Sequence, residues 1–557
     1  MPKSAELGAL LTLLKERSGH SYQSIGRVIN ASKSAVHRYC TGHSLPPEFG
    51  VVERIARVCG ARPDELSRLY RLWEAAVLSA QDAQDTQNAQ DLPDEPVAEP
   101  VAEPVPAPVG RAAPRHRAGA LAMFVGLLAV MALILAPSGG RVVPARSPVN
   151  GGPAVPGIWT LPAAPVPATL FGVTINSATG AMPGFRVGAV RLWDSGTLWA
   201  HLQPHRGAFD WSVLDRLVNG ARRAGRPVLF VMGGTPQWAS PNGRIGPYPG
   251  GSRTSPPDRL ADWDGFVTGL ATRYRGRIEA YELWVLANDP RFYSGSMETL
   301  VEMTRRASRI IRSVDPSAVL VCPGMGRLWS ADGRASLRRF AELGGFDHCD
   351  VAGIKLHQRQ AGDPPETMLE LAATADRAFH EAGVHPRLWS TGTTYDIPLQ
   401  GKLEETKARN HAVRFYLTGL YARHFNLERM YFYNWGGTKI PIVLQAVGRP
   451  PTAAARAVEE LQRWLAHARH YSCGHGAAIG LPANVWRCQF AITQPGRSRE
   501  AAVLWTDSGT ATITTPVDIE AVRRLDGGVA AVRAGYGLRV GEEPVLVEPA
   551  RQGRSRP

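Results

Sequence analysis

The chain has 557 residues, a formal net charge of +14 and an isoelectric point near 9.8. This length excludes a single ordinary domain and predicts two to four. The excess of positive charge suits nucleic acid or another anionic surface, but the charge is uneven along the chain. Residues 72–110 contain no Lys or Arg, which predicts a linker between functional parts.

The first region, residues 1–78, predicts four or five short amphipathic helices, among them 5–17 and 22–29. Ser32 stands where it would cap a third helix. The run 21–39, SYQSIGRVINASKSAVHRY, resembles the helix-turn-helix of Xre/Cro-like proteins. The resemblance implies that four apolar side chains hold two helices together: Ile25, Val28, Ile29 and Val36.

In that family the second helix enters the major groove of DNA with its N-terminal end first. The resemblance therefore implies that the outward-facing residues of this helix reach base edges and phosphates. In this chain those residues are Lys33, Ser34, His37 and Arg38. The alternative is that the same fold docks a cytoplasmic protein and that these side chains form an ordinary solvated face.

An acidic, Pro-rich linker is expected over residues 79–117, followed by a long apolar stretch at 118–136. The stretch AGALAMFVGLLAVMALILA carries no charge and is long enough to cross a bilayer as a helix. Basic residues crowd its N-terminal side, at Arg111, Arg115 and Arg117. The positive-inside rule then predicts a single-pass plasma-membrane protein with a cytoplasmic N-terminus and an extracytoplasmic C-terminal part.

After a second, Pro/Gly-rich linker at 137–169, apolar strands alternate with helical patterns as far as residue 465. This alternation predicts an α/β fold with parallel strands. The eight candidate strands are 170–173, 189–192, 227–232, 280–284, 319–322, 351–356, 387–390 and 430–434. Eight such units favour a (β/α)8 TIM barrel, whose functional residues lie at the C-terminal ends of the strands.

Short β-prone runs between residues 466 and 550 predict a small appended β-sandwich, before a tail at 551–557. Cys473 and Cys488 fall within it and could close a disulfide loop. Cys322 and Cys349, near neighbouring barrel strands, are a weaker candidate pair. No cysteine spacing resembles a zinc site, so neither a metal nor another cofactor is expected.

Two strand-end runs, EAYELWVLAND at 279–289 and RLWSTGT at 387–393, resemble motifs of retaining (β/α)8 glycoside hydrolases, nearest to β-xylosidases of family 39. In that family the runs read Trp-Asn-Glu-Pro-Asn and Trp-Asn-Thr-Glu-Thr, and their glutamates are the general acid and the nucleophile. Here those positions hold Leu286 and Gly392. A retaining glycosidase needs two carboxyl groups about 5 Å apart. The resemblance therefore implies a glycosidase-like domain without its catalytic pair.

Other strand-end residues match the chemistry of sugar recognition, in which aromatic rings stack on sugar faces and polar groups bond hydroxyls. The resemblance implies a carbohydrate pocket formed by Arg191, Trp193, Asp194, Trp238, Asn288, His357, Tyr433 and Trp435. Asp289 and Asp396, just past the missing glutamates, are the fallback carboxylates if catalysis has been relocated. Glu282 is expected lower in the barrel, as an interior charge.

Together these features predict a membrane-anchored helix-turn-helix regulator whose outer, catalytically inactive barrel binds a glycan. Ligand-driven clustering or homo-oligomerisation would couple the two ends by raising the local concentration of the DNA-binding modules. One alternative resembles the layout of RodZ-type proteins, a membrane scaffold for cell-wall or cytoskeletal proteins. The other is a membrane-tethered glycoside hydrolase with a relocated acid/base pair.

Overall fold

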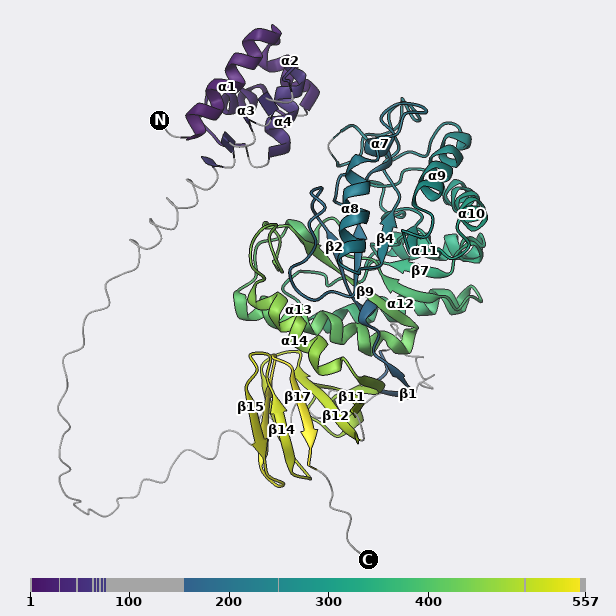
Figure 1. The fold of residues 1–557 in the computed structure, drawn as a ribbon, viewed down its shortest axis with the longest axis vertical. Helices are drawn as coiled ribbons and strands as arrows, with labels where there is room; N and C mark the ends of the chain where they lie inside the picture. Colours follow the sequence, from purple (N-terminus) through teal and green to yellow (C-terminus); the bar gives the residue numbers. More distant parts are fainter. Residues whose placement is uncertain are drawn as a thin grey trace, which may run out of the picture. The chain divides into compact units, whose positions relative to one another are not determined.

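The computed structural model describes two stretches of the chain. The first is residues 3–76, with gaps at 30, 47–48, 63–64, 67, 70–71 and 74, and the second is residues 155–550, apart from 249 and 495–496. These residues fall into two compact units, one within Met1–Ser147 and the other within Pro148–Pro557 (Figure 1). Each unit has a hydrophobic core of its own.

The N-terminal unit is helical, as its sequence predicts. Its helices include α1 (Lys3–Ser18), α2 (Tyr22–Ile29), α3 (Lys33–Cys40) and α4 (Phe49–Val58). Ser32 caps α3 as expected, because its hydroxyl accepts a hydrogen bond from the Ala35 amide at 3.1 Å. The cap satisfies one of the amides that the first turn of a helix leaves unpaired, and so fixes where α3 begins.

Three of the four residues expected between α2 and α3 are in the core. Ile25, Ile29 and Val36 are buried, but Val28 is 68% exposed, so its assignment to the core is wrong. Successive residues of a helix turn by about 100°, which places Gly26 and Ile29 on one side of Ile25 and Val28 on the other. Gly26 is buried there, and a Cβ on it would lie 2.5 Å from the Ala31 carbonyl oxygen, so α2 approaches its neighbour along that side.

The C-terminal unit contains a closed barrel of eight parallel strands, as the alternating pattern predicts. Its strands are β2 (Phe171–Ile175), β3 (Ala189–Leu192), β4 (Val228–Val231), β5 (Ala280–Glu282), β6 (Val319–Val321), β7 (Val351–Ile354), β8 (Arg387–Ser390) and β9 (Leu427–Trp435). Strand β9 pairs with β2 and closes the ring. The C-terminal ends of all eight strands therefore meet at one mouth.

Helices follow the strands and cover the outside of the barrel (Figure 1). They are the short α7 (Trp199–Leu202), α8 (Ser212–Arg223), α9 (Leu260–Tyr274), α10 (Met297–Val314), α11 (Ala331–Glu342), α12 (Met368–Glu381), α13 (Glu405–Tyr421) and α14 (Ala453–Leu465). Six 3-10 turns complete the described part: η1 (Ala168–Leu170), η2 (Gly345–His348), η3 (Pro365–Thr367), η4 (Ile397–Leu399), η5 (Ala422–Phe425) and η6 (Gly476–Ile479).

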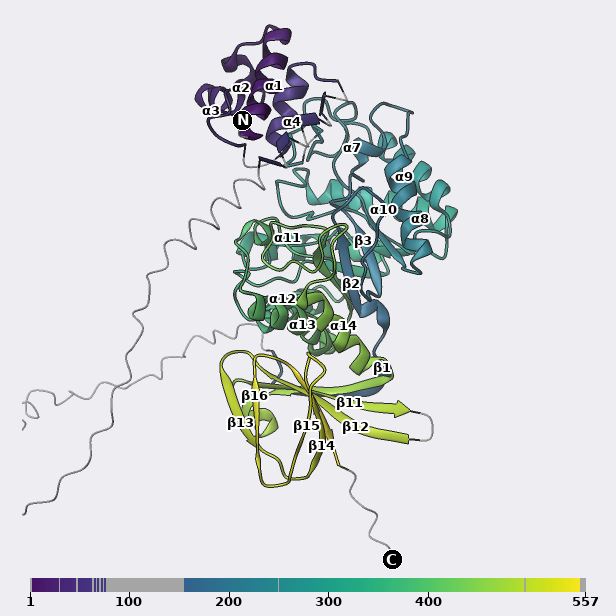
Figure 2. The ribbon, with the colours of Figure 1, turned by 60° about the vertical axis from the view of Figure 1, so that its left-hand side comes forward.

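Two antiparallel sheets accompany the barrel (Figure 2). The larger is ordered β1 (Ile158–Pro165), β10 (Ala468–His475), β11 (Val485–Gln494), β12 (Arg497–Thr506), β17 (Val545–Pro549), β14 (Ile519–Arg523) and β15 (Val529–Val532). The smaller pairs β13 (Thr510–Thr514) with β16 (Gly537–Gly541). Leu538 and Val540 of the small sheet share a core with Val545 and Val547 of the large one, so the sheets face each other.

Strand β1 corrects the expected linker at 137–169. Residues 158–165 of that segment form an edge strand that pairs with β10, about 310 positions later in the chain. Trp159 is buried against this sheet, and its carbonyl accepts a hydrogen bond from the Ser472 hydroxyl at 2.8 Å. The two prolines of the segment are tolerated because an edge strand leaves one side of its backbone unpaired.

The expected membrane span is also corrected, and with it the single-pass plasma-membrane placement. Among the residues that the structure describes, no helix is both long enough and apolar enough to cross a membrane. A helix that crosses a bilayer needs about 20 predominantly apolar residues. The longest described helix, α10, has 18 residues and carries Glu302, Arg305 and Arg306. The stretch 118–136, on which the expectation was based, lies outside the described residues.

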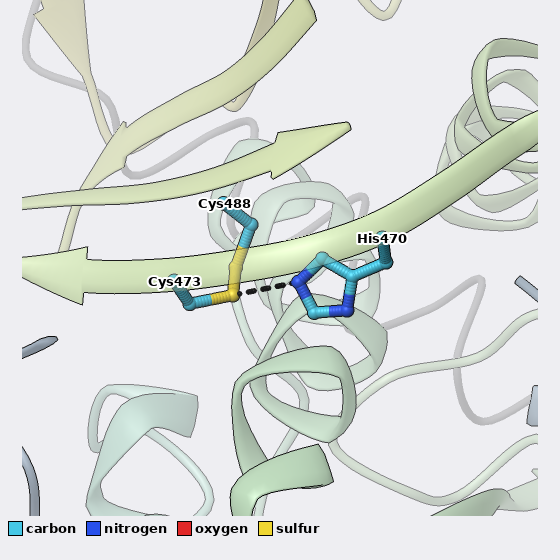
Figure 3. Close-up of side chains that lie close together, drawn as sticks. All are labelled: His470, Cys473 and Cys488. Carbon is cyan, nitrogen blue, oxygen red and sulfur yellow. Dashed lines mark hydrogen bonds between the residues drawn. A yellow bond between two sulfur atoms is a disulfide. The ribbon is translucent and has the colours of Figure 1, made fainter. Parts of the chain in front are cut away.

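Two disulfide bonds lie in the C-terminal unit. Cys473 on β10 is bonded to Cys488 on β11, where the two strands pair directly (Figure 3). Cys322, just after β6, is bonded to Cys349, just before β7. Both bonds join the residues that the sequence offers as pairs. Each connects neighbouring strands, so each restricts the unfolded chain without drawing distant elements together.

Candidate functional site

The exposed face of α3 gathers the four residues expected to bind DNA. Lys33, Ser34, His37 and Arg38 are all exposed, whereas Val36 and Cys40 on the opposite side are buried. The His37 ring meets the Tyr22 ring of α2 edge to face, with centroids 5.1 Å apart. The helix therefore presents two cationic side chains and a hydroxyl on one surface, which is the chemistry that contacts phosphates and base edges.

In the barrel, a small pocket opens at the mouth formed by the C-terminal strand ends. Five aromatic residues line it: Trp193, Tyr248, Phe292, Tyr395 and Tyr433. Its polar lining is Arg191, Asp194, Lys355, Thr393 and Thr394. The pocket has a volume of about 100 Å³. Aromatic rings mixed with a few converging polar groups are typical of a small-ligand site.

Hydrogen bonds order the aromatic wall of the pocket. Trp193 Nε1 donates to the Tyr248 hydroxyl at 2.6 Å, and the Tyr433 hydroxyl donates to Asp194 at 2.5 Å. Burial raises the pKa of Asp194, and the hydrogen bond from Tyr433 acts in the opposite direction. Four of the predicted sugar-binding residues thus meet in one place, together with Tyr248, which follows β4 on a long loop and was not predicted.

The other four predicted residues do not line this pocket. Trp238 donates to the Gln203 carbonyl at 2.8 Å, and the buried Trp435 donates to Gln445 at 2.9 Å. The Asn288 amide makes two hydrogen bonds with the backbone of Gly326. Its Nδ2 donates to the carbonyl at 2.7 Å, and its Oδ1 accepts from the amide at 2.7 Å. These three side chains hold loops in place.

His357 lies in a neighbouring cavity that shares Thr393, Pro398 and Tyr433 with the mouth pocket. Its Nδ1 donates to the Gln358 carbonyl at 2.6 Å, and its buried Nε2 has no hydrogen-bond partner. Burial lowers the pKa of His357 to about 4, so the imidazole is neutral at physiological pH. The free Nε2 can accept a hydrogen bond from a ligand hydroxyl entering this cavity.

The two positions expected to hold catalytic glutamates differ in their surroundings. Leu286, with φ of +40°, packs in an apolar cluster at the mouth with Trp193, Val285 and Phe292. Gly392 follows β8 with φ of +101°. A Cβ on it would meet nothing nearer than Arg191 Nη1, at 3.5 Å. One position is therefore filled by an apolar side chain, and the other borders empty space.

An ion cluster lies directly below the pocket, inside the barrel. Glu282 is fully buried, with Oε2 2.9 Å from Arg191 Nε and Oε1 2.5 Å from Lys355 Nζ. Thr391 completes the cluster, because its carbonyl and hydroxyl oxygens accept from Lys355 at 2.7 and 2.6 Å. Burial alone would raise the pKa of Glu282, but the Arg191 and Lys355 charges hold it below its ordinary value. Glu282 is the interior charge that the sequence predicts, whereas Lys355 was not singled out.

The fallback carboxylates are both held by one arginine. Arg291 lies 2.6 Å from Asp289 and 2.6 Å from Asp396. Neither carboxylate lines the mouth pocket. The hydrogen bond from Arg291 lowers the pKa of Asp396, which is the opposite of what a general acid requires. This arrangement suits a structural clamp between two loops better than an acid/base pair.

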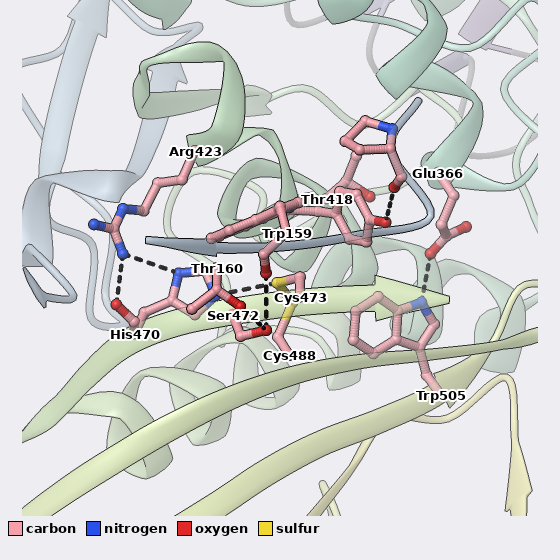
Figure 4. The surroundings of a disulfide bond; sticks show 12 residues. Trp159, Thr160, Glu366, Thr418, Arg423, His470, Ser472, Cys473, Cys488 and Trp505 are labelled. Carbon is pink, nitrogen blue, oxygen red and sulfur yellow. Dashed lines mark hydrogen bonds between the residues drawn. A yellow bond between two sulfur atoms is a disulfide. The ribbon is translucent and has the colours of Figure 1, made fainter. Parts of the chain in front are cut away.

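His470, Cys473 and Cys488 also lie close together, with possible metal-binding atoms within 4.8 Å of one another. The two sulfur atoms are bonded to each other, however, and metals bind thiolates. His470 Nε2 lies 3.1 Å from Cys473 Sγ, and Arg423 donates to the His470 carbonyl at 2.7 Å (Figures 3 and 4). Burial lowers the pKa of His470 to about 3. In this oxidised form the cluster is a packing element of the sheet.

Comparison with known families identifies one part of the chain. Residues 6–69 match a family described as a helix-turn-helix domain. The chain therefore carries a helix-turn-helix domain in its N-terminal unit, as the resemblance of residues 21–39 implies. No curated protein matches the chain.

Solved structures resemble the C-terminal unit. A family 39 glycoside hydrolase from the gut symbiont Bacteroides cellulosilyticus WH2 is 16% identical, with a TM-score of 0.49 over 70% of this chain and 81% of that one. A glucosidase from Croceicoccus marinus is 14% identical, with a TM-score of 0.47 over 71% and 98%. A family 10 glycoside hydrolase from Paenibacillus barcinonensis is 15% identical, with a TM-score of 0.40 over 53% and 95%. These likenesses concern the fold alone.

Proposed function

We propose that this protein is a DNA-binding regulator whose barrel binds a carbohydrate and does not hydrolyse it. The observation that carries the proposal is the mouth pocket, which combines five aromatic rings with polar groups but holds one carboxyl, that of Asp194. Leu286 and Gly392 stand at the two positions where the resemblance expects carboxyls. The helix-turn-helix domain, with its exposed cationic helix, supports the regulatory half of the proposal.

The chemistry of the pocket suits a sugar. A sugar ring offers apolar C–H faces to aromatic side chains and hydroxyls to polar ones, and the pocket presents both kinds of group. Asp194 and Tyr433 are already ordered by their mutual hydrogen bond, so little freedom is lost when a hydroxyl binds them. The volume of about 100 Å³ favours the end of a glycan over a chain that runs across the mouth.

Hydrolysis is expected to be absent. The full chain should release no nitrophenol from a panel of nitrophenyl glycosides above the rate in buffer, because a retaining mechanism needs both a nucleophile and an acid. The measurement is continuous absorbance with Asp289→Ala and Asp396→Ala alongside. Turnover that either substitution abolishes would instead make the chain a hydrolase with a relocated pair.

The same protein on a glycan array should still retain a ligand, and no retention would contradict the carbohydrate half of the proposal.

Arg38→Ala is expected to weaken specific DNA binding by about 1–3 kcal/mol, because an arginine on the exposed face of α3 contacts base edges on this proposal. The sites are first found by incubating the full chain with sheared genomic DNA and sequencing the bound fragments. The matched control is Arg54→Ala, which removes an exposed arginine from α4. Equal loss in the two variants would indicate charge attraction alone, and the absence of discrete sites would favour a protein-docking role.

A further inference from the structure

The space beside Gly392 is the starting point. The glycine is buried at the end of β8, and a Cβ added to it would lie 3.5 Å from Arg191 Nη1 and 3.8 Å from Thr174 Oγ1. It borders the cavity that shares Thr393 and Tyr433 with the mouth pocket. A ligand group that enters from the mouth can therefore approach Arg191 and Thr174 where a longer side chain at position 392 would otherwise stand.

Two side chains beside this space each carry a polar atom without a partner. Arg191 Nη2 and Thr174 Oγ1 are buried and make no hydrogen bond, although the Arg191 guanidinium is fixed through its Nε by Glu282. Buried polar groups are nearly always hydrogen-bonded, so unpartnered donors around one space point to a missing acceptor.

The charge around the space identifies the acceptor. Arg191 and Lys355 are both basic side chains and share one ionised carboxylate, Glu282, which they contact at different oxygens. Asp194, the other carboxyl of the pocket, has a pKa raised by burial and is hydrogen-bonded to Tyr433. A guanidinium edge with an adjacent hydroxyl matches a carboxylate better than it matches a neutral sugar hydroxyl.

We propose that the space beside Gly392 is a binding site for a carboxylate, and that the barrel therefore recognises an acidic glycan that carries a uronic acid. The inference rests on the proposed carbohydrate-binding function and names its ligand class. Arg191 donates to the carboxylate through Nη1 and Nη2, and Thr174 donates through its hydroxyl. The sugar ring lies toward Tyr433 and the aromatic wall of the mouth pocket.

Calorimetric titration of the full chain tests the ligand class. The probes are disaccharides ending in glucuronic or galacturonic acid, their neutral counterparts with a hydroxymethyl group in place of the carboxylate, and sodium formate. An acidic disaccharide should bind at least about tenfold more tightly than its neutral counterpart, because its carboxylate makes charge-assisted hydrogen bonds with buried groups that otherwise have no partner. Formate should compete with it. Equal affinity within a pair would overturn the inference and leave the proposed function standing.

The remaining outcomes separate the two proposals. Formate binding without any disaccharide binding would keep the anion site and overturn the carbohydrate function. No binding of any probe would overturn both. Thr174→Val is the sharpest variant, because its hydroxyl makes no hydrogen bond in the free protein and the fold loses none. It should lower affinity for the acidic disaccharide several-fold and leave affinity for the neutral one unchanged.

Gly392→Asp supplies a carboxylate from the chain itself and should abolish formate binding. Its control is Gly383→Asp, at a glycine with φ of +70° and open surroundings after α12. Both substitutions place an aspartate at a positive φ, which strains the backbone in each, and they differ in where the charge lies. Formate binding that survives Gly392→Asp would contradict the assignment of the site.

Discussion

Replacing Glu282 by glutamine is expected to lower the free energy of unfolding of the C-terminal unit by about 3–5 kcal/mol. The side chain is fully buried, and its two oxygens lie 2.9 Å from Arg191 and 2.5 Å from Lys355. Glutamine preserves the shape but removes the charge. The two buried basic side chains then lose the carboxylate they share, and the amide group turns a donor toward one of them.

Lys355 gives this variant a distinctive dependence on pH. Burial and the Arg191 charge already lower the pKa of Lys355 to about 7, and Glu282 opposes them. Without Glu282 the folded-state pKa falls further. Between the two folded-state pKa values the wild-type lysine is charged and the variant lysine is neutral, so only the variant loses stability as pH falls. The unfolding free energy of the variant should therefore fall furthest below that of the wild type at acid pH, and the difference should level off above about pH 7.

Urea denaturation at pH 6, 7 and 8, followed by tryptophan fluorescence, measures this difference. The control is Glu298→Gln, which removes the same group from an exposed pair with Arg339 at 2.6 Å. That loss is expected to be several times smaller than the loss in Glu282→Gln, since water screens the pair. If the two variants lost equal stability, the buried cluster would not be held together by its charges.

The sequence predicts the barrel well because each strand is a short apolar run bounded by turns. Such a run can be recognised from neighbouring residues alone. The expected strands 189–192 and 387–390 coincide with β3 and β8. Strand β1 was missed for the opposite reason. Its partner β10 lies about 310 positions away, and two prolines in 158–165 imitate a linker. Nothing local indicates that Trp159 will be buried by that distant strand.

The candidate site was predictable as a location but not in detail. Residues at strand ends converge on the mouth, which is why Arg191, Trp193 and Asp194 meet there. Sequence alone does not show which way a ring turns, and Trp238 turns away from the mouth pocket. Lys355 carried a weak signal, since it stands two residues before His357 and alternation along a strand places both on one face.

Lowering the pH from 7 to 5 is expected to cost the C-terminal unit about 6 kcal/mol, because three buried histidines are neutral in the folded state. Burial lowers the pKa of His357 to about 4 and those of His411 and His470 to about 3. In the unfolded chain these groups titrate near pH 6.5, so only the unfolded state gains protons between pH 6.5 and pH 5. Each histidine contributes about 1.4 kcal/mol per pH unit over that interval. Protonation of Asp194, whose folded-state pKa is raised, acts in the opposite direction.

The slope of the unfolding free energy against pH reports how many more protons the unfolded state binds than the folded state. It does not depend on the absolute stability, so it distinguishes histidine titration from a general loss of stability. Between pH 6 and pH 5 the wild type should show a slope approaching three protons from these histidines. His411→Gln should reduce the slope by about one proton, whatever it does to stability at pH 7. His205→Gln is the control, since this ring is exposed and meets water in both states. A slope unchanged by His411→Gln would mean that His411 takes up its proton without unfolding the barrel, through an opening of α13 toward solvent.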